Sequence, residues 1–236
     1  MFSDLKKYEI LLPEVAPESL NDLSEELRIY KDKILEVWFS PRGVCAEKPQ
    51  LWILGITPGW NQMRIAYEEA SNAMQQGLSR SEAIKVRKPN VAFAGSMRKN
   101  LVSMLDELDF AKIFDVPTST DLFGSEILRT GSVLKYPVFK KGANYTGHSP
   151  KPTSHPVLVK MIDEVLGDEL DEIGDCLILP LGKSVEYVLD YLVSQGRLDQ
   201  KRILNGFPHP SGANGHRKKQ FAECKKSLKT KIKQSY

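Results

Sequence analysis

Two short runs of apolar residues constrain the fold of this chain more than any other feature. Residues 51–56 read Leu-Trp-Ile-Leu-Gly-Ile, and residues 175–181 read Asp-Cys-Leu-Ile-Leu-Pro-Leu. Runs of this length and composition are typical of strands buried on both faces of a parallel sheet. Further strands are expected at residues 127–134 and 202–204. Because helical segments separate them, these strands predict an α/β fold, an α/β/α sandwich around a short four-stranded parallel sheet.

Helical spacing of apolar residues predicts the segments that cover this sheet. These helices are expected at residues 62–86, 96–107, 157–165, 182–195 and 216–232. The same spacing over residues 18–38 predicts an additional helix near the N-terminus. We therefore expect a helical extension at residues 1–48 and one main domain at residues 49–236.

Length and composition exclude several classes of protein. The 236 residues, of which 41% are hydrophobic and 27% charged, suit one soluble globular domain with an extension. No apolar run approaches the roughly 18 residues of a membrane helix, and no signal peptide is visible, so a cytoplasmic protein is expected. The three cysteines lack the spacing of a disulfide framework or a metal site. Neither a phosphate loop nor a dinucleotide-binding glycine pattern occurs, so no cofactor and no metal is expected, and we expect a monomer.

Positive charge is concentrated in three parts of the chain. Residues 201–236 contain ten basic residues and one acid, Glu223, a local charge of +9 in a chain whose net charge is +3. Residues 85–99 and 131–161 each contain five lysine or arginine residues and no acid. Such stretches are either solvated surfaces or a rim that binds phosphates, and charge alone favours the first interpretation. The choice depends on whether they flank a chemical site.

Two turns that follow strands contain residues suited to chemistry, because sites in parallel sheets lie beyond the carboxyl ends of the strands. Gly55-Ile-Thr-Pro-Gly59 follows the first strand, and its glycines allow backbone to approach a ligand closely. His209-Pro-Ser-Gly212 follows the last strand, where prolines on both sides restrict the backbone of the histidine. Taken alone, each turn is also explained as an ordinary loop.

In this order and separation, the two turns resemble the uracil-DNA glycosylase superfamily, which has a Gly-x-x-Pro-Gly-type water-positioning loop and a His-Pro-Ser loop. Phe93-Ala-Gly95 is similar to the element whose aromatic side chain stacks on the flipped base. Residues 131–137 resemble the strand that carries the base-reading residue, and Leu181-Gly-Lys183 resembles a turn near the DNA backbone. The resemblance covers about residues 49–232.

The resemblance implies a DNA glycosylase, an enzyme that flips a base out of DNA and hydrolyses its N-glycosidic bond. His209 would stabilise the departing base, and Thr57 or Asn61 would position the attacking water. The base pocket would be formed by Gly55, Ile56, Pro58, Gln62, Phe93 and Ser132. Contacts to DNA would come from Gly182, Lys183, Ser211, Asn214, His216 and Arg217. The last two occupy the place where this family inserts a wedge residue into the base stack.

Two substitutions distinguish the chain from uracil-specific members of the superfamily. Thr57 stands where those enzymes have aspartate or asparagine, and a hydroxyl cannot act as a general base near neutral pH. Because the sugar becomes oxocarbenium-like, stabilising the departing base can carry much of the reaction, and Asn61 or Gln62 is an alternative residue for holding the water. Ser132, or Thr130 if the alignment shifts, replaces the asparagine that reads uracil.

These differences favour a base larger than uracil. About thirty residues, 61–90, separate the first loop from Phe93, and Ser132 leaves more room than an asparagine would. Bacterial anti-phage glycosylases of this superfamily excise glucosylated hydroxymethylcytosine, and the chain is compatible with that group. The hydroxyls of such a sugar could bond to Asn61, Gln62, Asn144 or Tyr145. The cysteines of the iron–sulfur branch of the superfamily are absent from the sequence.

Other functions are also compatible with these residues. The chain could be an ordinary uracil or mismatch repair glycosylase, or a catalytically silent DNA-binding module of the same fold. It could also be a hydrolase of free nucleosides or nucleotides, although the basic stretches argue against a small substrate. Release of a base from modified duplexes distinguishes a glycosylase from a silent module.

Overall fold

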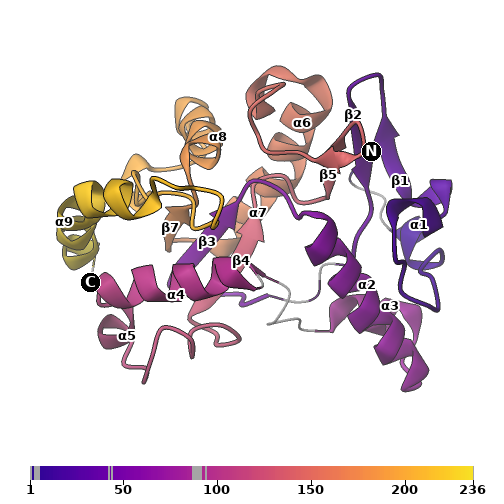
Figure 1. The fold of residues 1–236 in the computed structure, drawn as a ribbon, viewed down its shortest axis with the longest axis horizontal. Helices are drawn as coiled ribbons and strands as arrows, with labels where there is room; N and C mark the ends of the chain where they lie inside the picture. Colours follow the sequence, from indigo (N-terminus) through magenta and orange to yellow (C-terminus); the bar gives the residue numbers. More distant parts are fainter. Residues whose placement is uncertain are drawn as a thin grey trace.

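The computed structural model describes residues 2, 6–41, 43, 45–86, 92–93 and 95–235. Its centre is a parallel sheet with strand order β4-β3-β7. The strands are β3 (Leu51–Gly55), β4 (Leu128–Ser132) and β7 (Leu177–Pro180). Figure 1 shows them in the middle of the molecule. Every position of β3 and β7 is buried. The first three predicted strands are therefore confirmed.

The fourth predicted strand, residues 202–204, is wrong. Ile203 forms a single parallel bridge to Ile178, and the Leu204 N–H donates to the Ile178 carbonyl at 2.8 Å. The 3₁₀ helix η5 (Gln200–Arg202) ends directly before Ile203, and Gly206 and Pro208 soon follow, so too few residues are left to extend beside β7. The sheet therefore has three strands and one additional bridge at its β7 edge.

Helices cover both faces of this sheet. The longer ones are α2 (Trp60–Gln75), α4 (Ser96–Glu107), α8 (Lys183–Ser194) and α9 (Arg217–Ser235). The shorter ones are α1 (Lys6–Glu9), α3 (Arg80–Lys85), α5 (Phe110–Ile113), α6 (Pro156–Met161), the π-helical η4 (Ile162–Leu166) and α7 (Gly167–Ile173). Trp52 and Leu54 belong to one apolar cluster, with residues of α2, α6, α7 and α8. Leu51 and Ile53 belong to a second, with residues of α4 and α9, because alternate side chains of a strand point to opposite faces.

Most of the predicted helices are present. The segment predicted as one helix at residues 62–86 forms α2 and α3, because Gly77 turns the chain with a φ of 94°. The helix predicted at residues 157–165 begins as α6 and continues through η4 into α7. The others are confirmed, at residues 96–107, 182–195 and 216–232. Within the described parts of the chain, no helix combines the length and apolar character that crossing a membrane requires.

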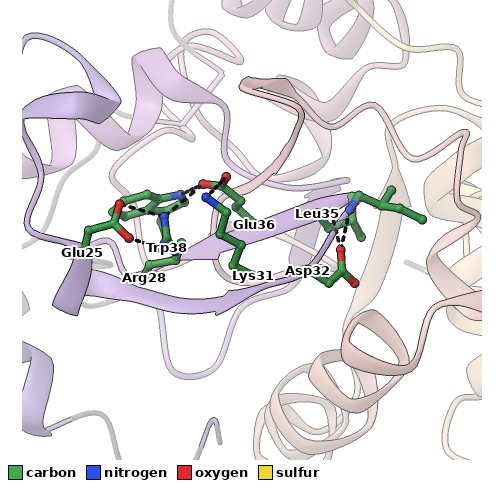
Figure 2. A network of polar contacts seen from close by, with 8 residues as sticks. Glu25, Arg28, Lys31, Asp32, Leu35, Glu36 and Trp38 are labelled. Atoms are coloured by element: carbon green, nitrogen blue, oxygen red, sulfur yellow. Dashed lines mark hydrogen bonds and ion pairs between the residues drawn. The ribbon is translucent and has the colours of Figure 1, made fainter.

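The N-terminal helix predicted at residues 18–38 is wrong, because this segment is a β-hairpin preceded by two 3₁₀ turns, η1 (Leu20–Asp22) and η2 (Glu25–Leu27). Strand β1 (Arg28–Lys31) pairs antiparallel with β2 (Leu35–Trp38). Asp32 closes the turn between them, since its Oδ1 accepts the Leu35 N–H at 2.7 Å (Figure 2). A short polar side chain that bonds the backbone in this way favours a turn over a continuing helix.

The hairpin belongs to a second, antiparallel sheet. Strand β2 pairs with β5 (Val138–Lys140), which pairs with β6 (Ala143–Asn144), in the order β1-β2-β5-β6. Figure 2 shows polar contacts along the hairpin, where Glu36 accepts the Trp38 indole N–H at 3.1 Å. Because β5 lies in the predicted main domain, this sheet crosses the boundary predicted at residue 48. The first 48 residues are therefore not a helical extension.

Candidate active site

The three parallel strands end at one edge of the sheet, and backbone hydrogen bonds hold the segments that follow them together. Gly55 pairs with Ser132 at the ends of β3 and β4. The Leu134 N–H donates to the Ile56 carbonyl at 2.9 Å, and the Leu181 N–H donates to a β3 carbonyl at 2.9 Å. The turn at residues 55–59 begins at this edge, directly after β3. The turn at residues 209–212 lies against Gly182, which follows β7.

Phe93 and Ser132, two of the residues predicted to bind the base, both lie close to a third, Gly55. A Cβ atom at Gly55 would lie 3.3 Å from the Phe93 Cε1 atom and 3.9 Å from the Ser132 Oγ atom. The absence of a side chain at Gly55 therefore lets the Phe93 ring lie against the strand end. Phe93 is 3% exposed and has a φ of 53°, which is uncommon for a residue other than glycine. Ala94, in the same predicted motif, lies outside the described residues.

The Thr57 hydroxyl makes two hydrogen bonds to the backbone that the sequence did not predict. It donates to the Tyr136 carbonyl at 2.9 Å and accepts the Val138 N–H at 3.1 Å. A hydroxyl has one proton to donate, so the Thr57 proton is committed to the backbone before β5. The side chain joins the turn after β3 to the start of β5. Sequence reasoning missed this role because the partners lie about eighty positions away.

We expect Thr57→Val to destabilise the protein by about 1–3 kcal/mol, because the substitution keeps the volume of the side chain and leaves the buried Val138 N–H without an acceptor. Urea unfolding measures the change, and Thr57→Ser, which keeps the hydroxyl, is the matched control. A Thr57→Val protein as stable as the parent would contradict this structural role.

The first turn of α2 carries two further predicted residues and one partner from β6. The Gln62 Oε1 atom accepts the Gly59 N–H at 2.9 Å, so this amide caps the helix. The Asn144 Oδ1 atom accepts the Trp60 N–H at 2.8 Å, and its Nδ2 atom lies 3.3 Å from the position of a Cβ at Gly59. Asn61 is exposed beside them. Asn61 and Asn144 therefore place two amides at the turn, and Gln62 is committed to capping.

A loop after β6 forms a wall of the site that the sequence did not predict. A Cβ at Gly147 would lie 2.9 Å from the Ile56 Cγ1 atom and 2.8 Å from the Ser184 Cβ atom. The loop therefore packs between the turn after β3 and the start of α8, and Gly147, with a φ of 81°, is required for this close approach. Tyr145 is buried and its hydroxyl donates to the Pro150 carbonyl, so it contributes to the fold of the loop.

His209 is held in one orientation. Its Nδ1 atom accepts the Ser211 N–H at 3.2 Å, so in the neutral imidazole the proton is on Nε2. Burial lowers the pKa of His209, which favours this neutral form. Gly182, with a φ of 90°, approaches the histidine closely, since a Cβ there would lie 3.1 Å from the His209 Cβ. Gly182, predicted to contact DNA, thus lies against the predicted catalytic residue.

The loop that carries His209 is braced by two predicted DNA-binding residues. The Arg217 guanidinium donates to the Ser211 carbonyl at 2.8 Å and to the Asn100 Oδ1 at 3.2 Å. The Asn214 Nδ2 atom donates to the His209 carbonyl at 3.2 Å. Arg217 and Asn214 therefore position this loop. Asn100, on α4, was missed by sequence reasoning because nothing in its local pattern indicates a contact with residues more than a hundred positions away.

The remaining predicted residues lie around this arrangement. Lys183 and His216 are exposed, and Pro58 is half-buried in the turn after β3. The Ser211 hydroxyl accepts the Ala213 N–H at 3.2 Å, so it stabilises the turn after His209. Among the described residues, no group of three or more metal-ligating side chains could hold an ion.

The basic stretches differ in how their charges are used. On α9, Lys225 pairs with Glu107 at 2.7 Å and Lys229 pairs with Asp109 at 2.6 Å, so these cations attach the helix to the body. Lys218 and Lys219 are exposed in the first turn of α9, directly after the brace. Of the stretch at residues 85–99, positions 87–91 and 94 lie outside the described residues.

Comparison with known proteins shows that the chain is similar to a bacterial protein. The chain is 40% identical over 215 residues to the uncharacterized protein YoxB of Bacillus subtilis (strain 168). The match covers 89% of this chain and 84% of that protein. No family model matches the chain.

Proposed function

The chain belongs to the same family as YoxB, and we propose that it is a DNA glycosylase that flips a modified base out of DNA and hydrolyses its N-glycosidic bond. The observation that carries this proposal is the fixed, neutral imidazole of His209 at the edge where Gly55, Phe93 and Ser132 meet the strand ends. The base departs with the electrons of the broken bond and becomes negatively charged. The His209 Nε2–H can donate to that charge, and the Phe93 ring offers an aromatic surface for the base.

His209 acts on the departing base in this proposal. Cleavage of the bond leaves negative charge on the base, and the His209 Nε2–H donates to a carbonyl oxygen on which that charge develops. The Ser211 N–H and the close approach of Gly182 hold the ring before DNA binds, so little reorganisation accompanies the reaction. The depressed pKa keeps the imidazole neutral, with its proton on the atom that faces the base.

The attacking water is held by an amide in this proposal. Because the Thr57 proton is committed to Tyr136, Asn61 takes the place that the sequence assigned first to Thr57. An amide orients water without removing its proton. Such orientation suffices where the sugar cation is already close to formed and the departing base is stabilised.

The target in this proposal is a bulky modified pyrimidine, such as glucosylated hydroxymethylcytosine in phage DNA, excised as an antiviral defence. Ser132 supplies one rotating hydroxyl at the base pocket, which satisfies several base edges and rejects few. The exposed Asn144 amide, whose Oδ1 atom accepts the Trp60 N–H, has its Nδ2 donor left for a hydroxyl of the attached sugar. Ordinary uracil or mismatch repair is the alternative target range for the same chemistry.

A catalytically silent DNA-binding module is the second candidate. The commitment of the Thr57 hydroxyl to backbone groups favours it, since no strong base stands at that turn. A screen of base release separates the two candidates, using otherwise identical duplexes that contain uracil, hypoxanthine, hydroxymethylcytosine or glucosylated hydroxymethylcytosine. The glycosylase predicts abasic sites in at least one of these duplexes, and the silent module predicts binding with none.

We expect Lys218→Ala with Lys219→Ala to weaken duplex binding and to reduce the slope of log affinity against log salt by about 0.9 for each lost phosphate contact. The matched control on the same helix is Lys225→Ala with Lys229→Ala, which removes the same charge from cations already paired with acids. Fluorescence anisotropy over a range of salt concentrations measures both slopes. Equal salt slopes for the two double variants would show that Lys218 and Lys219 make no phosphate contacts and are only solvated.

A further inference from the structure

Tyr187 on α8 has an exposed side chain that has no role in the proposed reaction. The described residues include five large apolar or aromatic side chains that are strongly exposed, and Tyr187, at 58%, is the aromatic one among them. An exposed aromatic ring supplies a flat surface on which a base of any sequence can stack.

Tyr187 lies close to the candidate active site. It is one helical turn beyond Lys183, the first residue of α8, and therefore about 6 Å further along the helix axis. Gly182, directly before the helix, lies against His209, and Ser184 lies against Gly147 in the wall of the site. Tyr187 is therefore one turn along the helix that begins beside His209.

The charges around the ring suit a nucleic acid backbone. The Lys151 Nζ atom lies over the Tyr187 ring, 6.0 Å from its centroid, and Lys183 is exposed on the preceding turn. The acid next to Tyr187 in the chain, Glu186, accepts the Gly206 N–H and is committed to the fold. Asp190, one turn beyond, is the exposed acid on this helix.

We propose that Tyr187, with Lys151 and Lys183, forms a stacking platform for an unpaired nucleotide next to the flipped one, so that the partner on this surface is single-stranded DNA. Stacking on the ring and pairing of phosphates with the two lysines are the two contributions of single-strand binding sites. The platform extends the proposed function and rests on it, because the flipped nucleotide belongs to the proposed glycosylase reaction. Its test uses a strand without an excisable base, so the two proposals fail separately.

The test compares a fluorescein-labelled oligothymidine with the same strand annealed to its complement, by anisotropy at salt concentrations from about 50 to about 200 mM. Tyr187→Ala is expected to weaken oligothymidine binding by about tenfold, within the range found when a stacked aromatic side chain is truncated, and to change duplex binding by less than about twofold. Tyr187→Phe keeps the ring and should bind like the parent. Lys151→Ala and Lys183→Ala should each reduce the single-strand salt slope by about 0.7.

Val15→Ala is the matched control, because Val15 is 76% exposed and lies in the N-terminal segment outside the proposed site. Three results would overturn the platform: no binding of oligothymidine by the parent, a Tyr187→Ala affinity within about twofold of the parent, or equal losses on single strand and duplex. Base release bears on the proposed function alone. A chain that binds oligothymidine through Tyr187 and releases no base would keep the platform and exclude the glycosylase.

Discussion

Replacing His209 by alanine is expected to lower the rate of base release by about 10²–10³ while leaving the affinity for DNA nearly unchanged. The His209 Nε2–H donates to charge that develops as the base departs, so its contribution is made mainly in the transition state. Loss of one preorganised donor of this kind commonly costs that factor in rate. Binding changes little because phosphate contacts supply most of the affinity.

Single-turnover base release measures this effect, and anisotropy on the same duplex measures binding. Thermal unfolding of the His209→Ala protein, compared with that of the parent, tests whether the variant is still folded. A variant that releases the base within about twofold of the parent rate would remove His209 from the mechanism, whatever its affinity.

The pH profile of the parent gives an independent check on His209. Burial lowers its pKa, so the imidazole is neutral at neutral pH and gains a proton only below its usual titration range. That proton would occupy Nδ1 and face the Ser211 N–H, which would break the bond that orients the ring. The rate is therefore expected to be constant above neutral pH and to fall as the pH drops through the lowered pKa. His209→Ala should lose this acid limb.

Gly182→Ala is expected to reduce the rate of base release by at least about tenfold. Gly182 has a φ of 90°, and an added Cβ would lie 3.1 Å from the His209 Cβ, so the His209 loop must shift. A misplacement of about 1 Å can cost about 10² in rate, and a few tenths of an ångström costs part of that. The left-handed backbone adds about 1–3 kcal/mol of strain once a side chain is present.

Gly215→Ala is the matched control for this substitution. Gly215 lies in the segment between His209 and α9, and a Cβ there meets no atom within 4 Å. Single-turnover rates of both variants, with urea unfolding of each, separate displacement of His209 from loss of stability. Equal rates for Gly182→Ala and Gly215→Ala would contradict the proposed support of His209 by Gly182.

The sequence predicted the parts of the fold that depend on local periodicity. The runs at residues 51–56 and 175–181 contain the buried strands β3 and β7, because an uninterrupted apolar run has no polar face to expose. The prediction of a helix at residues 18–38 failed because the apolar spacing there fits a helix. The hairpin that forms instead depends on Asp32 closing a turn and on pairing with β5, about a hundred residues away. Long-range pairing of this kind leaves no periodic signal.

The sequence indicated which residues lie near one another better than which bonds they form. Gly55 and Ser132 were expected together because strand ends meet at one edge of a parallel sheet, and Phe93, which also lies near Gly55, was expected there from the family resemblance. The two hydrogen bonds of the Thr57 hydroxyl were not predicted, because their partners are backbone groups of Tyr136 and Val138, which no motif identifies. A residue type indicates which bonds a side chain can make, and only the tertiary structure determines which partners receive them.

The most direct test of the proposed activity is single-turnover base release from two duplexes that differ only at the target base, one with glucosylated hydroxymethylcytosine and one with uracil. We expect release of the bulky pyrimidine, faster than uracil, because the single rotating hydroxyl of Ser132 selects weakly among base edges. Faster release of uracil would contradict the proposed target. Release of neither base, with both duplexes bound, would contradict this account of the site and favour the silent module.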